Sequence, residues 1–500
     1  MLPSIVNLRI ALVALLLAVS AARAQTTQPV SITVDQATRF QTIQGLGTGV
    51  ASDSPVWNPL YLQVFTQDLG ASALRIDLTA DIIPNQVTLG PDLQANTNLF
   101  NFQGNYPQTN WGQFAAQAYK ATNGQMKIIG SIFSPAPWLK SNDSQDNGGN
   151  LIQTPANLTQ FARYMAAYVK GFQQAYGVPL YGVSIQNEPR FAEPYPSTVY
   201  SDAQYVAAID AVGAEFAKDG ITTKIFGPED VGVDGGFVTQ QTMGYINAIK
   251  ADPAASNYVS FYGIHGFSGE APAPADEANW ADYANQISAN GKESWQTEYS
   301  GENPAWIHTD TFGRPDGAID VALNMHEALT YGNESAYLYF QLDDGDHTTT
   351  STTTLTGSLD TSSLKYNAAK HYMKFIRPGA VRVAATPDNP SGVSVDAFVE
   401  PDNSLTIELI NTSAYDTPTS IAIPGTTYSS FAEYLTTATQ PWAVLPNLTV
   451  SSNSLSLTLP AESIVTLQSL AGSAAAPVPE PAALALLVPA SLLLLRRRHS

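Results

Sequence analysis

Two glutamates stand at the tips of two apolar, strand-like segments of the 500-residue chain. The run YGVSIQNEPRF, residues 181 to 191, ends in Asn187, Glu188 and Pro189, and the run WQTEYS places Glu298 at a second tip. Carboxyl groups about 5 to 5.5 Å apart serve as nucleophile and acid/base in retaining glycoside hydrolysis. Since both charges cannot ionise freely at that distance, one pKa rises and that group can donate a proton near neutrality. A simple turn is the alternative for Glu188, and the repetition of the pattern argues against it.

Eight strand-like segments alternate with helical periodicity along the first two thirds of the chain. This alternation predicts an α/β fold, a (β/α)8 TIM barrel, in which the active site lies at the carboxyl ends of the strands. Glu188 then ends the fourth strand and Glu298 the seventh. A doubly wound nucleotide-binding sheet is disfavoured because its GxGxxG turn is missing. The expected strands are 42–49, 73–79, 127–134, 180–188, 224–230, 260–267, 293–300 and 335–342.

Short alternating strands separated by Pro, Asn, Asp and Gly turns follow the barrel and predict an attached antiparallel β-sandwich. The segment VSITVD near the amino terminus is a plausible additional strand of this sandwich. The expected organisation is a signal peptide at 1–24, an N-terminal strand contributed to the sandwich at 25–40, the catalytic barrel at 41–370, the sandwich at 371–470 and a linker with a sorting tail at 471–500.

Composition limits the classes of partner. With 44% hydrophobic residues the chain can bury a large core, and its formal charge of −20 disfavours nucleic acid and anionic membranes as partners. No cysteine is present, which excludes disulfides, thiolate metal sites and a cysteine nucleophile. The pattern HExxH and carboxylate-rich calcium loops are also missing, so we expect no metal and no cofactor. We expect a monomer.

Both ends of the chain have the composition of targeting signals. Arg9, an apolar run and the small residues before Gln25 are typical of a secretory signal peptide. The carboxyl-terminal segment has a Val-Pro-Glu-Pro turn, an apolar run that is short for a membrane span, and Arg496 to Arg498. It resembles the PEP-CTERM sorting signal of Gram-negative bacteria, although an ordinary anchor is the alternative. The resemblance implies recognition by sorting machinery and a secreted or envelope-associated protein.

Five segments together resemble glycoside hydrolase family 30, a family of retaining (β/α)8 glycosidases with an attached sandwich. They are SIQNEP, WQTEYS, SPAPWLK, GPED and KFIRPGAVRVAA. The resemblance implies that Glu188 is the acid/base, that Glu298 is the nucleophile and that Asn187 binds the sugar 2-hydroxyl. Local similarity is greatest to the xylanase branch, which implies a polysaccharide substrate.

Other residues are candidates for the substrate site. Arg75 on the second strand could keep the nucleophile ionised, with a surface ion pair as the alternative. Trp138 offers a flat face for sugar stacking, unless it packs in the core. His265 at the end of the sixth strand, together with Tyr195 and Tyr299, could line the cleft, with core packing equally expected for each of the three.

Two positions depart from the family pattern. Phe267 stands where many relatives have a tyrosine after the strand-six histidine, and Phe340 stands at the place of a strand-eight tryptophan. The segment QLDDGDH has Asp343 and two further acids where glucuronate-dependent xylanases use an arginine, and Arg190 is the only cation nearby. These features predict an endo-β-1,4-xylanase that does not depend on glucuronate side groups. The alternatives are hydrolysis of β-1,6-glucan, β-1,6-galactan or a β-glucoside, and a catalytically silent carbohydrate-binding surface protein.

Overall fold

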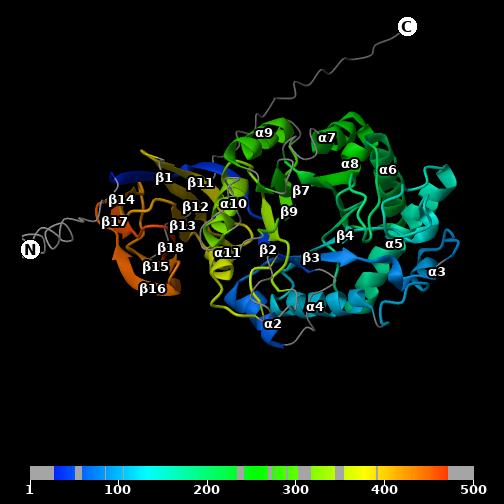
Figure 1. Cartoon of the computed structure of the whole chain (residues 1–500), viewed down its shortest axis with the longest axis horizontal. Coiled ribbons are helices and arrows are strands. Elements are labelled where there is room, and N and C mark those ends of the chain that lie inside the picture. Colours follow the sequence, from blue (N-terminus) through cyan, green and yellow to red (C-terminus); the bar gives the residue numbers. More distant parts are fainter. Residues whose placement is uncertain are drawn as a thin grey trace, which may run out of the picture.

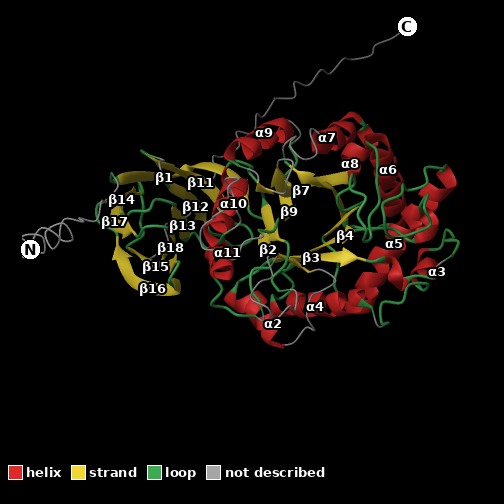
Figure 2. Ribbon diagram, viewed as in Figure 1, coloured by secondary structure: helices red, strands yellow, loops and turns green. Residues whose placement is uncertain are grey.

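The chain forms two adjoining bodies, a barrel surrounded by helices and a β-sandwich (Figure 1, Figure 2). The predicted signal peptide and sorting tail lie outside the described residues, and no helix within the described part is long and apolar enough to cross a membrane. The computed structural model describes residues 28–50, 59–84, 86–104, 106–233, 241–268, 273–274, 276–288, 291–301, 317–343, 354–357, 359–389 and 392–470.

Eight parallel strands close into the predicted barrel, because the sheet order runs from β6 through β2 to β7 and β6 pairs with β7. Strand β7 also forms a short antiparallel pair with β8 (Ala273–Pro274). The barrel strands are β2 (Gly45–Val50), β3 (Ala73–Leu78), β4 (Lys127–Ile132), β5 (Gly182–Ser184), β6 (Lys224–Gly232), β7 (Val259–Ser268), β9 (Ser294–Glu298) and β10 (Ala336–Tyr339).

Helices follow the strands and cover the barrel, as the sequence periodicity predicts. Local signals set their ends: Ser201 and Gln204 form a reciprocal capping box at the start of α6, and Gly220 ends that helix with φ 66°. The α-helices of the described residues are α2 (Pro59–Gln63), α3 (Leu93–Thr97), α4 (Pro107–Ala121), α5 (Pro155–Tyr176), α6 (Asp202–Asp219), α7 (Gln241–Ala251), α8 (Pro253–Tyr258), α9 (Glu277–Ser288), α10 (Ala318–Thr330) and α11 (Leu364–Phe375).

The sandwich is built from nine strands in the order β16-β15-β18-β13-β12-β11-β1-β14-β17. All of its described pairings are antiparallel except that between β1 and β14, so the amino-terminal strand is inserted between β11 and β14. Its strands are β1 (Val30–Thr42), β11 (Val381–Pro387), β12 (Val393–Val399), β13 (Leu405–Asn411), β14 (Thr417–Ala422), β15 (Ser430–Thr437), β16 (Gln440–Thr449), β17 (Ser454–Leu459) and β18 (Ser463–Ser469).

The strand that leads to Glu188 is much shorter than its sequence predicts. The expected strand 180–188 is regular only over β5, so Glu188 lies beyond the strand rather than at its last residue. The side-chain amide of Gln186 donates hydrogen bonds to the backbone carbonyl oxygens of Phe133 and Asn187. Glu188 then adopts a left-handed φ of 44°, which is incompatible with a continuing strand. The carboxylate is therefore presented by a bent loop.

Helices α10 and α11 lie between the barrel and the sandwich (Figure 2) and join them through a buried ion pair. His326 Nδ1 of α10 lies 2.9 Å from Asp396 Oδ2 of β12, and Tyr372 and Thr330 donate hydrogen bonds to the same carboxylate. Burial alone would lower the pKa of His326, but Asp396 outweighs it and the pKa is raised. Burial likewise opposes ionisation of Asp396, yet His326 keeps its pKa lowered.

We expect His326→Gln to lower the free energy of unfolding by about 3 kcal/mol, because the substitution leaves Asp396 buried without its cation. The contribution of His326 is complete below the pKa of an unfolded histidine, about 6.5, and is lost as pH rises through the raised folded pKa. Urea unfolding at pH 6 and pH 8 measures this change. Wild-type protein should lose more stability over the interval than the variant.

A second histidine of the same junction provides the matched control. His371 of α11 contacts the hydroxyls of Thr466 and Thr436, and burial, together with Lys370, lowers its pKa to about 3. Folded His371 is therefore neutral at both pH values, whereas an unfolded histidine binds a proton below about 6.5, so His371 stabilises the fold more at pH 8 than at pH 6. His371→Gln should consequently lose more stability over the interval than wild-type protein, the opposite of His326→Gln. An equal decline in wild-type protein and in His326→Gln would contradict the assignment.

Candidate active site

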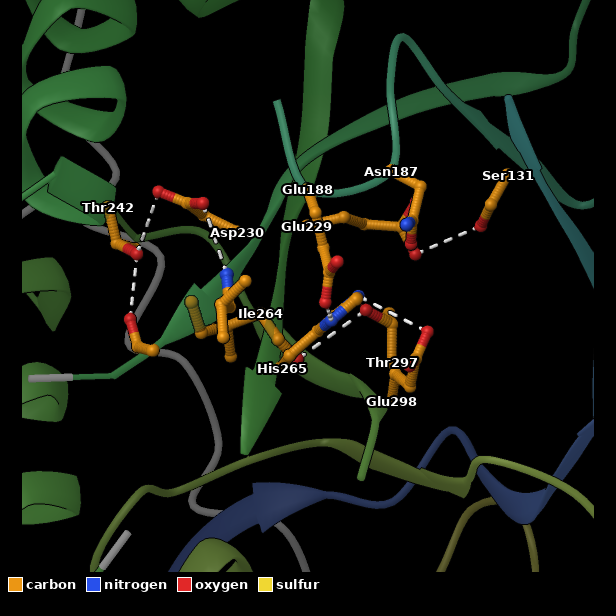
Figure 3. A network of polar contacts seen from close by, with 12 residues as sticks. Ser131, Asn187, Glu188, Glu229, Asp230, Thr242, Ile264, His265, Thr297 and Glu298 are labelled. Carbon is orange, nitrogen blue, oxygen red and sulfur yellow. Dashed lines mark hydrogen bonds and ion pairs between the residues drawn. The ribbon is translucent and has the colours of Figure 1, made fainter. Parts of the chain in front are cut away.

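The two predicted carboxylates meet at the carboxyl end of the barrel (Figure 3). Glu298 is the last residue of β9, and Glu188 follows β5 in the bent loop. Their side chains are 15% exposed for Glu188 and 14% for Glu298, so both reach solvent from a largely buried position. One carboxylate oxygen of each lies within 4.8 Å of the other. This separation matches the spacing of retaining glycosidases and is shorter than the roughly 6.5 to 9.5 Å of inverting ones.

His265 lies between the two carboxylates. Its Nδ1 is 3.0 Å from Glu188 Oε1, and its Nε2 is 3.7 Å from Glu298 Oε2. The parallel pairing of β7 with β9 sets this position, because His265 is in register with Glu298. Burial lowers the pKa of His265 despite the nearby carboxylate of Glu298. The ring is therefore neutral near pH 7 and has one N–H, which it can donate to only one of the two glutamates at a time.

Arg75 of β3 is fully buried beneath the pair. Its Nη1 lies 2.8 Å from Glu298 Oε2, and its Nη2 donates a 2.6 Å hydrogen bond to Asn187 Oδ1. A guanidinium at this distance favours the ionised form of Glu298. Arg75 is only 1% exposed, so it does not present a surface to substrate. It was predicted among the substrate-binding residues, but it lies beneath them.

The environment of the two glutamates favours a proton on Glu188. Burial raises the pKa of Glu188 to about 7, with a smaller opposing effect of Arg75. Burial also raises the pKa of Glu298, but His265 and Arg75 both act in the opposite direction. Arg75 contacts Glu298 directly. The arrangement can therefore supply a protonated acid and an ionised nucleophile on facing strand ends.

The other predicted residues differ in how far they reach the surface. Asn187 is 5% exposed and Tyr195 is 47% exposed, and burial, followed by the charge of Glu188, raises the pKa of Tyr195. Trp138 is partly buried against the barrel core, so only part of its ring is accessible. Tyr299 is 1% exposed and packs 5.2 Å from the ring of Phe267. Tyr299 therefore packs among aromatic rings, which is the alternative that the sequence left open for it.

Two further expectations concern the neighbouring strand ends. Phe340 is half-buried directly after β10, and its N–H donates to the carbonyl of Tyr299. Asp343 is buried and accepts a 2.6 Å hydrogen bond from the N–H of Leu359, so it does not face a substrate as the sequence suggested. The other two acids of that segment, Asp344 and Asp346, lie outside the described residues.

Several residues of the site were missed by the sequence reasoning. Glu229 of β6 is fully buried and forms an ion pair with Arg75 at 3.1 Å. Ser131 of β4 donates a hydrogen bond to Glu229, and burial raises the pKa of the adjacent Asp77 to about 8. A sequence pattern for Glu229 was present. The segment GPED ends an apolar strand in two acids, and an acid at a strand tip is the pattern that identified Glu188 and Glu298.

The site also has a donor set of a kind found at metal centres. Donor atoms of Glu188, His265 and Glu298 all lie within 4.8 Å of one another. Arg75 already places a cationic group 2.8 Å from Glu298, so the protein itself compensates the negative charge. The donor set is therefore accounted for by a carboxylate pair held between a guanidinium and an imidazole.

Comparisons with known proteins find glycosyl hydrolases among similar sequences and structures. Residues 379–467 match the Glycosyl hydrolase family 30 beta sandwich domain. Glucuronoxylanase XynC of Bacillus subtilis (strain 168) is 26% identical over 346 residues, which are 67% of this chain and 74% of the relative. Endo-1,6-beta-D-glucanase neg1 of Aspergillus fumigatus is 23% identical over 323 residues, which are 59% of this chain and 61% of the relative.

Solved structures share the fold. The family 30 subfamily 8 xylanase Xyn30A from Clostridium acetobutylicum superimposes with a TM-score of 0.70 at 22% identity, covering 88% of this chain and 100% of that one. The barrel, its sandwich and the paired carboxylates define the class, a glycoside hydrolase. The chain is thus similar to glycoside hydrolase family 30 in its sandwich sequence and in its fold.

Proposed function

We propose that the protein is a secreted, retaining endo-β-1,4-xylanase with Glu298 as nucleophile and Glu188 as acid/base. The observation that carries the mechanism is the separation of the two carboxylates, whose nearest donor oxygens lie within 4.8 Å. At this spacing no water fits between nucleophile and sugar in the first step, and attack by the carboxylate itself is favoured.

The proposed reaction is a double displacement. A carboxylate oxygen of Glu298 forms a bond to the anomeric carbon while the bond to the leaving oxygen breaks, and Glu188 transfers its proton to that oxygen. Glu188 is then ionised and removes a proton from a water molecule, whose oxygen attacks the anomeric carbon and releases Glu298. Two inversions give net retention. Asn187 is proposed to bind the sugar 2-hydroxyl, and the exposed ring of Tyr195 is proposed to contact a sugar face.

The similarity to a glucuronoxylanase and to a xylanase structure supports xylan as the substrate. Dependence on glucuronate is disfavoured by the surroundings of Arg190, the cation next to Glu188. Its guanidinium is paired with Asp202 and lies 4.2 Å from the ring of Tyr245. A substrate uronate would have to displace Asp202 from this pair.

A second candidate is hydrolysis of β-1,6-glucan. It is favoured by the similarity to an endo-1,6-β-D-glucanase, and it uses the same two carboxylates. The two candidates differ in the linkage that the cleft accepts.

We expect the purified protein to cleave glucuronoxylan and the same polymer after carboxyl reduction at similar initial rates, with slower release of sugar from β-1,6-glucan. An ion pair between a guanidinium and a substrate uronate contributes about 2 kcal/mol to binding. A glucuronate-dependent enzyme would therefore act about 30-fold more slowly on the carboxyl-reduced polymer. Arg190→Gln is the matched variant, and the ratio of the two rates should be unchanged in it. A large loss on carboxyl reduction would show that glucuronate is read, and preferential cleavage of β-1,6-glucan would establish the second candidate.

A further inference from the structure

Glu229 lies behind the carboxylate pair (Figure 3) and is connected to both of its members, to Glu188 through the backbone and to Glu298 through Arg75. Its side chain is fully buried at the end of β6, and its Oε1 accepts hydrogen bonds from Arg75 Nε at 3.1 Å and from Ser131 Oγ at 3.0 Å. The same guanidinium contacts Glu298 through Nη1. One cation is therefore held between two carboxylates, those of Glu229 and Glu298.

The backbone of Glu229 makes the second connection. The N–H of Glu188 donates a 2.9 Å hydrogen bond to the carbonyl oxygen of Glu229. Both residues have a left-handed backbone, with φ 44° at Glu188 and 53° at Glu229. For a residue other than glycine this backbone conformation costs about 1 kcal/mol or more, and the conformation persists only where surrounding contacts hold it. The loop that presents Glu188 is thus fixed on the strand end that carries Glu229.

More acidic groups than cationic groups surround Glu229. Its negative charge acts on six titratable groups of the described residues, and Arg75 is the only permanent cation among these six. These groups are Arg75 and Asp77 of β3, Glu188 of the bent loop, Tyr205 of α6, His265 of β7 and Glu298 of β9.

We propose that Glu229 is a positioning residue for the reaction: its carboxylate holds Arg75 against Glu298 while its carbonyl holds Glu188, and it thereby sets the distance and the charge balance of the pair. This inference rests on the proposed function. Glu229 does not touch the substrate in this assignment. It acts through Arg75 on the nucleophile and through the backbone on the acid/base.

The test is the pH profile of kcat/KM for Glu229→Gln, which keeps the shape of the side chain and removes its charge. The probe is 4-nitrophenyl β-xylobioside, or 4-nitrophenyl β-glucoside if the wild-type protein prefers it. The negative charge of Glu229 raises the pKa of both Glu188 and Glu298, so both limbs of the profile should move to lower pH, by about one unit. We also expect kcat to fall about 10- to 100-fold, with a smaller change in KM.

Two matched variants separate charge from packing. Ser131→Ala removes the hydroxyl that bridges Arg75 and Glu229 but keeps every charge, so both limbs should stay at their wild-type positions. Glu229→Asp keeps the charge on a shorter side chain, so it should restore the wild-type limbs while kcat stays reduced.

Folded Glu229→Gln protein with both limbs unmoved would overturn the proposal. If that variant does not fold, Glu229→Asp is the deciding variant. Wild-type kcat in Glu229→Asp would show that the contact between this carboxylate and Arg75 is unimportant, which would also overturn the proposal. Azide rescue of Glu298→Gly distinguishes this failure from failure of the proposed function. Absence of rescue counts against the function itself, whereas rescue combined with unmoved limbs counts only against the role of Glu229.

Discussion

Glu298→Gly should reduce hydrolysis of the polysaccharide by about 10⁴-fold or more, because it removes the carboxylate proposed to form the covalent intermediate. The glycine leaves a space in which azide can act as the nucleophile from the same side. Azide then forms a bond to the anomeric carbon while Glu188 protonates the departing oxygen. The expected product is a glycosyl azide of inverted configuration, measured by NMR with an activated aryl glycoside.

A control for this result is the glutamate directly before the same strand. Glu293 directly precedes β9 at the opposite end of the barrel, so Glu293→Gln removes an equal charge without approaching the site. It should keep wild-type activity and should gain nothing from azide. Substantial hydrolysis of natural polysaccharide by Glu298→Gly, or a glycosyl azide of retained configuration, would remove Glu298 from the role of nucleophile.

Glu188→Gln should lose activity in proportion to the need of the leaving group for a proton. On polysaccharide the loss should be about 10²- to 10⁴-fold, the usual contribution of a positioned general acid. With a 2,4-dinitrophenyl glycoside the first step should be nearly unaffected, since that group leaves without protonation. A burst of dinitrophenol followed by slow turnover is expected, because the variant also lacks the base that activates water.

The pH profile gives an independent measure of the same residue. Burial raises the pKa of Glu188 to about 7, and the reaction requires its protonated form, so kcat/KM of the wild-type protein should decline as pH rises through about 7. Glu188→Gln should lack this decline when both proteins are assayed on the polysaccharide, whose leaving group needs the proton. If the variant kept the basic limb at its wild-type position, the limb would belong to another group and Glu188 would not be the acid.

Much of the fold is predictable from the chain alone, because strand and helix periodicity are local properties. The eight barrel strands and the sandwich strands fall where alternating apolar residues and turn residues place them. Parallel strands closed into a barrel bring their carboxyl ends together, so two glutamates at strand tips are expected to meet wherever the barrel forms. The residue types and their place along each strand therefore determined the pair Glu188 and Glu298.

The tertiary structure decided how that pair is held and which of its neighbours reach the surface. Arg75 contacts residues more than one hundred positions away, Glu188 bends out of β5, and Tyr299 is covered by Phe267, although each was a candidate for the same cleft. Glu229 was overlooked, since its sequence pattern is only that of another acid at a strand tip. Ion pairing and burial set both the pKa of a carboxylate and the access to a side chain. These depend on which distant segments pack around a residue, and no local pattern in the sequence specifies that.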